Sequence, residues 1–448
     1  MRPALTPRFW NSECVITVSP TTALRCESCA GYALMLLEAM RRRRFNMRFW
    51  LGMSALAMLV ACGDDSTDQS PGSAGTGGTG TAGSAGTGGV AGTAGAGGSC
   101  DDVQSDPDNC GECGHGCQGG TCEAGMCQPV TLASELPYPY RVAVDATAVY
   151  FTVFGTYSAS SEVNFDGMLC SVPKEGGPVS VLTQGGLVAW GLAVDASNLY
   201  MSFAAQNYTA LYMYPKAGGV AVHLSSSSTN YMALDVNDAN ATASRVFFRD
   251  NDAVVAVTPG SAGVELAKVG TAVAGVATTG SEVVFGGAGD WDATGAPLGN
   301  GVLMKVSMSG GNTSTLDANA GSPYAVAADD THAYYTDLFG HRVMRASMDG
   351  SSVAAIATGQ SHPYGVVVDG EYVYWTNRGA GYWNKAMSCG GSGSLMRAPR
   401  GGGMVEVLAE GLDCPAWLVQ DDASLYWVEQ GTNPYQSTGD GRIARIAK

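Results

Sequence analysis

The fold is decided by the stretch Pro363-Tyr-Gly-Val-Val-Val-Asp369, Tyr374-Trp-Thr-Asn377, Leu395-Met-Arg-Ala-Pro-Arg400 and Val405-Glu-Val-Leu-Ala409. These four short runs are rich in apolar residues and are separated by Gly, Asp and Asn. The pattern predicts one four-stranded antiparallel sheet. Such a sheet cannot bury both of its faces alone, so it needs copies of itself packed against it.

The same pattern recurs seven times between Tyr138 and Lys448, in units of about 45 residues. One residue at the end of each first strand marks the copies: Asp145, Asp195, Asn237, Thr279, Asp329, Asp369 and Asp421. The last copy stops after its third strand. The missing fourth strand is supplied by Val130-Thr-Leu-Ala-Ser-Glu-Leu136, which resembles residues 405–412.

A ring whose last sheet takes strands from both ends of the chain has no free edge. The sequence therefore predicts an all-β protein with a seven-bladed β-propeller over residues 128–448. Two degenerate copies, the third and the fourth, leave six or eight blades open. A two-sheet sandwich is the other architecture that alternation alone would allow.

Two family resemblances follow from these motifs. Residues Tyr335-Thr-Asp337, His341 to Gly350 and Tyr374-Trp-Thr-Asn377 resemble the YWTD repeat of low-density-lipoprotein-receptor propellers. That resemblance covers roughly residues 320–380 well and implies a protein-binding role. Family propellers of this kind have six blades, whereas seven copies are counted here. The remaining copies look more like the looser repeats of bacterial surface lipoproteins.

The N-terminal region looks like an export signal. Residues 47–62 form a short apolar run behind Arg41 to Arg44, too short to span a bilayer. Leu59-Val-Ala-Cys62 resembles a bacterial lipobox, which implies a lipid anchor on Cys62 and delivery to the outer membrane. The alternative is an ordinary signal peptide with a chance cysteine. We therefore assign residues 1–61 to the signal region, with residues 1–46 as a mis-annotated start ahead of Met40 or Met47.

Charge and composition describe the exported chain. The whole sequence carries 24 basic and 40 acidic side chains, a net charge of −16. Removal of residues 1–61 takes away eight basic and three acidic side chains, which leaves a net of −21. Such an acidic surface disfavours nucleic acid as a partner. Residues 62–99, rich in Gly, Ala, Thr and Ser, predict a flexible linker with a root-mean-square span of about 30 Å.

Six of the 13 cysteines fall in residues 100–127: Cys100, Cys110, Cys113, Cys117, Cys122 and Cys127. An even number in so short an exported segment predicts three disulfides, of unknown pairing. The alternative is a zinc site on Cys110, Cys113 and His115. The segment resembles the stigma-specific-type motif of myxobacterial surface lipoproteins. Between copies six and seven, Cys389 and Cys414 lie in loops of the same face and predict a further disulfide. Cys170 is expected as a buried free thiol.

Four long loops follow second strands, at residues 154–167, 286–301, 378–394 and 430–441, and in a propeller they share one face. Recognition residues usually lie on such loops, and aromatic side chains supply contact area at a low entropy cost. The candidate contacts are Trp291, Tyr382, Trp383 and Tyr435 in the loops, and Tyr140, Trp190, Tyr324, Tyr364 and Trp417 at the channel rim. For the rim set, blade packing is the structural alternative.

The sequence therefore predicts a binding scaffold rather than an enzyme. It is expected to be anchored in the outer membrane, in the periplasm or at the cell surface, and to be held only by its lipid. The expected partner is an envelope or extracellular protein or glycan, and no cofactor is expected. A propeller enzyme of the lactonase or polysaccharide-lyase type is the alternative. Such enzymes place polar residues around a central metal, whereas the first strands here are apolar, as in Val366-Val-Val368 and Leu192-Ala-Val194.

Overall fold

The structure is a computed structural model that describes residues 102–156, 166–185, 188–205, 208–227, 234–237, 245–250, 252–292, 297–379, 389–433 and 439–448. The predicted signal region, Cys62, the linker and Cys100 lie outside these residues, as do Tyr382, Trp383 and Tyr435. Every regular element within them is a β-strand. None of the described residues forms a helix long and apolar enough to cross a membrane.

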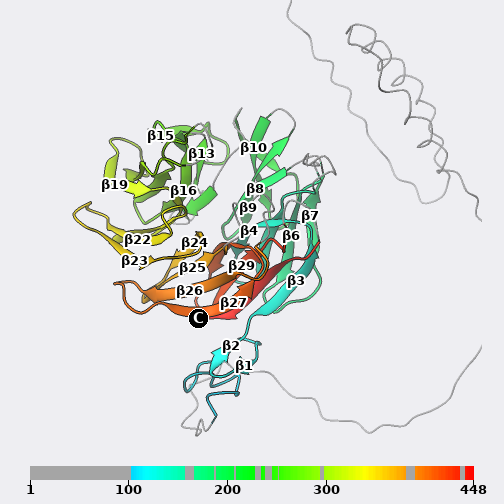
Figure 1. Ribbon diagram of the computed structural model, residues 1–448. Helices are drawn as coiled ribbons and strands as arrows, with labels where there is room; N and C mark the ends of the chain where they lie inside the picture. Colours follow the sequence, from blue (N-terminus) through cyan, green and yellow to red (C-terminus); the bar gives the residue numbers. More distant parts are fainter. Residues whose placement is uncertain are drawn as a thin grey trace, which may run out of the picture. The chain divides into compact units, whose positions relative to one another are not determined.

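Twenty-eight strands form seven four-stranded antiparallel sheets, which are the blades of a β-propeller (Figure 1). Blade 1 contains β4 (Pro139–Val144), β5 (Ala148–Val153), β6 (Met168–Pro173) and β7 (Ser180–Gln184). Blade 2 contains β8 (Val188–Val194), β9 (Asn198–Ala205), β10 (Tyr208–Pro215) and β11 (Val222–Ser227). Blade 3 contains β12 (Leu234–Asn237), β13 (Arg245–Asp250), β14 (Ala253–Val257) and β15 (Val264–Lys268).

Blade 4 contains β16 (Val273–Thr278), β17 (Glu282–Gly287), β18 (Gly301–Ser307) and β19 (Ser314–Gly321). Blade 5 contains β20 (Pro323–Ala328), β21 (His332–Asp337), β22 (Arg342–Ser347) and β23 (Val353–Thr358). Blade 6 contains β24 (Pro363–Val368), β25 (Tyr372–Asn377), β26 (Gly393–Pro399) and β27 (Glu406–Leu412). The first strand of each blade is the innermost one. The blade count of seven is confirmed, which excludes six and eight blades and the two-sheet sandwich.

Blade 7 closes the ring with strands from both ends of the domain. Its order is β28 (Pro415–Gln420), β29 (Ser424–Glu429), β30 (Gly441–Ala447) and β3 (Val130–Leu136). In Figure 1 the cyan β3 accordingly belongs with the red C-terminal strands. The closure predicted from the missing fourth strand is therefore confirmed. Pairing with β3 provides hydrogen-bond partners for the backbone edge that β30 would otherwise expose.

Second strands carry most of the core, because a blade lies against each of their faces. In β25 and β29 the side chains of Tyr374, Trp375, Tyr426 and Trp427 are at most 2% exposed. A short, continuous apolar run is the pattern expected of such fully covered strands. Outer strands show the opposite, as in β7, where half of the Val181 side chain is exposed.

Buried hydroxyl groups connect neighbouring blades near the channel. Thr336 Oγ1 accepts a hydrogen bond from the amide of Ala325 in its own blade (3.1 Å) and donates to the carbonyl of Tyr364 in the next blade (2.8 Å). Thr376 repeats the arrangement with Gly365 and Ala416. Both hydroxyls lie where a bulge interrupts the pairing of the first strand with the second. They therefore accept hydrogen bonds from first-strand amides that have no backbone partner in the sheet.

The residues that mark the repeat connect blades at the opposite end of the inner strands. Each of four Asp side chains accepts hydrogen bonds from backbone amides of its own turn and pairs with the cation that directly follows the third strand of the next blade. The cation–carboxylate pairs are Lys216 with Asp145, Arg400 with Asp329, Lys448 with Asp369, and Lys174 with Asp421. We call them the blade clamps. The sequence revealed the Asp positions but not these partners.

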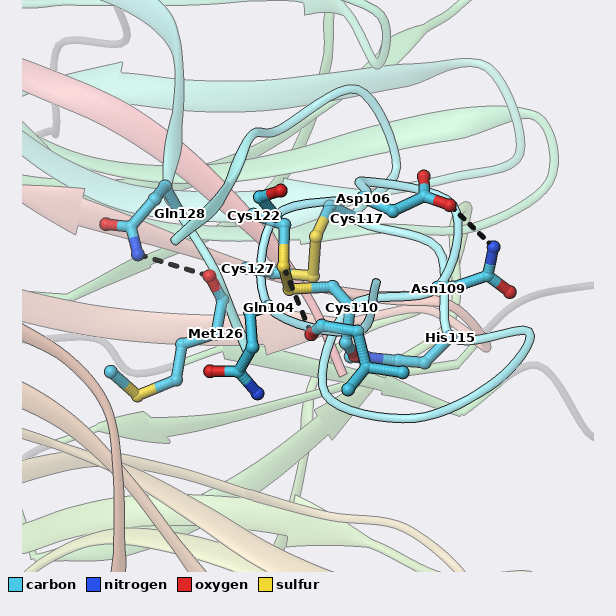
Figure 2. The surroundings of a disulfide bond; sticks show 12 residues. Gln104, Asp106, Asn109, Cys110, His115, Cys117, Cys122, Met126, Cys127 and Gln128 are labelled. Carbon is cyan, nitrogen blue, oxygen red and sulfur yellow. Dashed lines mark hydrogen bonds between the residues drawn. A yellow bond between two sulfur atoms is a disulfide. The ribbon is translucent and has the colours of Figure 1, made fainter. Parts of the chain in front are cut away.

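The cysteine segment forms a small module held by disulfides (Figure 2). Cys110 bonds to Cys122 and Cys117 to Cys127, around a two-stranded hairpin of β1 (Cys122–Glu123) and β2 (Met126–Cys127). Cys113 is also disulfide-bonded. The sulfur atoms needed for the zinc alternative are therefore already oxidised, and the disulfide prediction holds for the described cysteines.

The module packs against the propeller. His115 Nε2 lies 2.6 Å from the carbonyl oxygen of Lys448, and Arg445 donates a hydrogen bond to the carbonyl of Gln118. The cystine side chains also join a buried cluster with Leu412 and Trp427. The module thus contacts blade 7 at the end of β30, where β3 begins.

Candidate functional site

The two faces of the propeller differ. Because the strands of a blade are antiparallel, the loops between second and third strands share one face with the connections between blades. We call this the loop face. The turns after first and third strands lie on the other face, with the blade clamps and the cysteine module, and we call it the module face. The four long loops predicted from the sequence all belong to the loop face.

A disulfide joins two segments of the loop face. Cys389 in the loop after β25 bonds to Cys414 in the connection to blade 7, as the sequence predicted. The amide of Gly391 donates to the Asp413 carboxylate (2.8 Å), and the amide of Asp413 donates to Glu429 (3.0 Å). These bonds hold the described end of the largest insertion against blade 7.

Trp291 is the predicted loop contact that the structure describes. Its side chain is 45% exposed, and its ring meets that of Phe339 edge to face, with centroids 5.4 Å apart. The neighbouring Asp290 accepts a hydrogen bond from the side-chain amide of Asn300, which braces the base of the loop. Trp291 therefore presents an aromatic surface on the loop face.

The predicted rim aromatics pack against one another in two groups. Tyr324, Tyr364 and Trp417 come from blades 5, 6 and 7, and the two tyrosine hydroxyls lie 2.6 Å apart. On the other side, Tyr140 and Trp190 pack edge to face with centroids 5.6 Å apart. Tyr364 is 2% exposed, and the other four are partly exposed. These five side chains fill the channel near the loop face. They pack between blades, and four of them also keep part of their surface exposed.

Two arginines lie among these rings, and sequence reasoning missed both. The guanidinium carbon of Arg141 lies 3.2 Å from the ring centroid of Trp417, and that of Arg378 lies 4.7 Å from the centroid of Tyr364. Arg378 is 2% exposed and donates to Gln430 Oε1 (2.6 Å). Burial lowers the pKa of the Arg141 guanidinium, and neighbouring Arg249 acts in the same direction. An arginine nonetheless stays charged in a protein.

The channel contains a cavity of about 410 Å³. Its wall is made of Val, Ala and Leu side chains from six inner strands, with Arg141, Thr278, Trp417 and Gln420 as its polar members. The wall begins at Arg141 and Trp417 and continues to the ends of the inner strands, so the cavity occupies the half of the channel toward the module face. Apolar first strands were expected from the sequence, and Arg141 is the cation among the residues of this wall.

Two histidines meet on the loop face. The ring centroids of His341 and His362 are 4.8 Å apart, and their Nδ1 atoms contact the carbonyls of Gln360 (2.9 Å) and Gly379 (3.1 Å). Burial lowers the pKa of His362, and His341 adds to this effect. Both rings have backbone partners that fix their orientation.

The chain is similar to several solved structures at low sequence identity. No protein-family model matches the chain, and neither does any of the curated proteins compared with it. A structure of a nidogen/laminin complex is similar at 20% identity over 44% of this chain and 77% of that one, with a TM-score of 0.34. The computationally designed Ika8 protein is similar at 13% identity over 70% of this chain and 98% of that one, with a TM-score of 0.46. A structure assigned to TolB of Agrobacterium tumefaciens is similar at 14% identity over 60% of this chain and 94% of that one, with a TM-score of 0.37.

The chain is thus a seven-bladed β-propeller preceded by a disulfide-bonded module. The propeller fold that the YWTD resemblance implies is present, with seven blades instead of the six of that family, and residues of the motif have structural roles here. Thr336 and Thr376 connect blades, and Trp375 is fully buried.

Proposed function

We propose that this chain is an exported, lipid-anchored binding protein that presents the loop face of its propeller to a protein or glycan partner at the cell envelope. The observation that carries the proposal is the polarity of the propeller. The module, and with it the chain leading back to the linker, joins blade 7 at the module face. The loop face, with Trp291 and the described end of the disulfide-braced insertion, lies on the opposite side of the propeller from the module.

Binding rather than catalysis suits the chemistry of this surface. Exposed aromatic rings on loops held by a rigid scaffold are typical of recognition sites for proteins and glycans. The channel wall consists mainly of Val and Ala side chains, whereas a metal-dependent propeller enzyme needs oxygen or nitrogen ligands there. The net charge of the exported chain disfavours nucleic acid and anionic lipid as partners, so the lipid on Cys62 would be the membrane contact.

The anchor and the loop face are tested separately. Cys62→Ser in cells of the native host should move the protein from the membrane fraction to the soluble fraction, and retention in the membrane would contradict the anchor. For the loop face, Trp291→Ala and Trp383→Ala are compared with Met404→Ala in cross-linking to envelope proteins and in binding to immobilised envelope glycans. Met404 is 74% exposed in a turn of the module face and serves as the matched control.

The proposal predicts that the two tryptophan variants lose the partner retained by the wild type and by Met404→Ala. Equal retention by all four proteins, or capture of no protein or glycan by the wild type, would remove the loop face as the binding surface. Circular dichroism of each variant checks that the propeller is intact.

A further inference from the structure

Arg141 contributes a positive charge to the wall of the channel cavity. Among the described residues, no carboxylate pairs with it and no acceptor takes a hydrogen bond from its guanidinium, whose Nε is buried without a partner. The contacts it makes are with the rings of Trp417 and Tyr140. Arg249 is a second positive charge close enough to act on it. Arg141 is partly buried and borders the cavity, so its charge is partly desolvated and would be stabilised by a negative group placed there.

Trp417 presents a second unused donor at the same end of the cavity. Its indole Nε1 is buried without a hydrogen-bond partner, and its ring carries the Arg141 guanidinium. The position is unusual within the repeat. The equivalent inner-strand residues in blades 5 and 6 are Ala325 and Gly365, and a Cβ at Gly365 would lie 2.7 Å from the carbonyl oxygen of Ala416. Large side chains therefore enter the channel at this level from two adjacent strands, β4 and β28.

The far end of the cavity holds a polar group of the opposite kind. Gln420 donates from Nε2 to the carbonyl of Val368 (2.6 Å), while its Oε1 is buried without a donor. Trp417 and Gln420 are three residues apart on β28, which corresponds to about 10 Å along a strand. Between them the wall is apolar, with Val142, Val326 and Val366 among its members.

We infer that the central channel is a binding site for a small hydroxylated carboxylate of the sugar-acid class. The carboxylate takes the guanidinium of Arg141 and the indole N–H of Trp417, and a ligand hydroxyl reaches the amide oxygen of Gln420. The planar guanidinium fork matches a carboxylate in geometry. A pocket that is largely apolar with a few convergent polar groups is the usual form of a small-molecule site. Water could satisfy the Trp417 donor, but it would bring no charge to Arg141.

This site lies below the aromatic side chains of the loop face and is independent of the binding surface proposed above. A failure of either proposal therefore leaves the other in place. The two are distinguished by their variants, because Trp291→Ala and Trp383→Ala should leave channel binding unchanged.

The test is a titration of the mature chain with D-galacturonate, followed by calorimetry and by tryptophan fluorescence. Trp417 is one of six tryptophans after residue 61, so its signal is the part that Trp417→Phe removes. D-galactose is the uncharged control, and acetate is the carboxylate without hydroxyls. We expect saturable galacturonate binding, with at least tenfold weaker binding of galactose and acetate. Arg141→Met should weaken galacturonate at least tenfold. Arg397→Met is the matched control, because Arg397 also lies over a ring, that of Tyr372 (4.6 Å), but outside the channel.

Trp417→Phe keeps a ring under Arg141 and removes the N–H donor, so it tests the site even where Arg141→Met does not fold. It should weaken galacturonate several-fold. Equal binding of galacturonate and galactose, unchanged binding in both variants, or no binding of galacturonate overturns the proposal. Acetate binding as tight as that of galacturonate also overturns the assigned ligand class.

Discussion

The ammonium group of Lys216 in blade 2 lies 2.6 Å from the carboxylate of Asp145 in blade 1. Both side chains are less than one-fifth exposed. The same carboxylate accepts hydrogen bonds from the amides of Thr147 and Ala148 and from the hydroxyl of Tyr150. One carboxylate thus completes its own turn, orients the second strand and holds the next blade. This explains why the residue marks the repeat.

Lys216→Met should lower the free energy of unfolding at pH 7 by about 1–2 kcal/mol, because it leaves a partly buried carboxylate without its cation. Urea unfolding measures the effect. Lys268→Met is the control, since Lys268 faces Glu265 at 3.8 Å with both side chains more than half exposed. That variant should change the free energy by less than about 0.5 kcal/mol. An equal effect of the two variants would show that the clamp adds nothing to an ordinary surface pair.

Acid should weaken all four blade clamps together. Burial tends to raise the pKa of Asp145, but the bonds from Lys216 and the turn amides outweigh it and hold that pKa well below its usual value. The pKa values of Asp329, Asp369 and Asp421 are lowered as well. A lowered folded-state pKa stabilises the protein above the unfolded value of about 3.9, and this contribution is lost as the pH falls through the folded value. The contribution of the clamps should therefore be constant from pH 7 to about pH 5 and should be lost below about pH 4. The difference between the wild type and Lys216→Met should shrink over the same range.

Thr376→Val replaces a buried hydroxyl by a methyl group of similar shape. The amide of Gly365 and the carbonyl of Ala416 would both lose their partner in the interior. We expect a loss of about 2–4 kcal/mol, because unsatisfied buried polar groups cost about 1–3 kcal/mol each. Thr376→Ser keeps the hydroxyl and should cost about 1 kcal/mol. If thermal unfolding ranks the serine variant below the valine variant, the hydroxyl does not connect the blades.

Architecture could be predicted from the sequence because the repeat is local. Each copy encodes its own four strands, and the closing strand at residues 130–136 resembles the fourth strands elsewhere. The Cys389–Cys414 bridge followed from the same register, because both cysteines were placed in loops of one face. Long-range partners could not be predicted. Nothing near Asp145 in the sequence indicates that Lys216, 71 residues away, is its cation.

The candidate site was only partly predictable for the same reason. Sequence reasoning identified the aromatics one per blade, but it could not tell that Tyr324, Tyr364 and Trp417 pack together, because their contacts cross blade boundaries. Arg141 was missed because it follows an ordinary Pro-Tyr pair and breaks no local pattern. Its Gly and Ala equivalents in other blades are the one signal that could have revealed it. Most inner strands keep a small residue there, whereas blade 1 has Arg141 and blade 7 has Trp417.

Removal of β3 should prevent folding, whereas removal of the module should not. A chain that begins at Gln128 retains the closing strand, so it should give a cooperative unfolding transition with a midpoint a few degrees below that of the mature chain. A chain that begins at Tyr138 exposes the edge of β30 and should aggregate. Size-exclusion chromatography and circular dichroism distinguish the two. A soluble, cooperative domain without residues 130–136 would contradict the role of the closure.

Replacement of both Cys389 and Cys414 by Ser should destabilise the propeller by about 3.5 kcal/mol, the loop-closure value for cysteines that are 25 residues apart. The double variant is needed because a single one leaves a free thiol. Thermal unfolding with and without a reductant measures the effect, and Ser392→Ala in the same loop serves as the control. The reductant should lower the midpoint of the double variant less than that of the wild type, because one of its targets is absent.

Cys170 offers a direct measure of how tightly blade 1 is packed. It is the free cysteine among the described residues, its side chain is 1% exposed in β6, and burial raises its pKa to about 11. At pH 8 only about one thiol in a thousand would be ionised, and the thiolate is the reactive form. An aromatic disulfide reagent should therefore titrate the same number of thiols in the native wild type and in native Cys170→Ala. In guanidinium the wild type should show one more. If the native wild type titrates one thiol more than native Cys170→Ala, blade 1 opens readily. The fully covered second strand would then not protect the outer strands of that blade from the reagent.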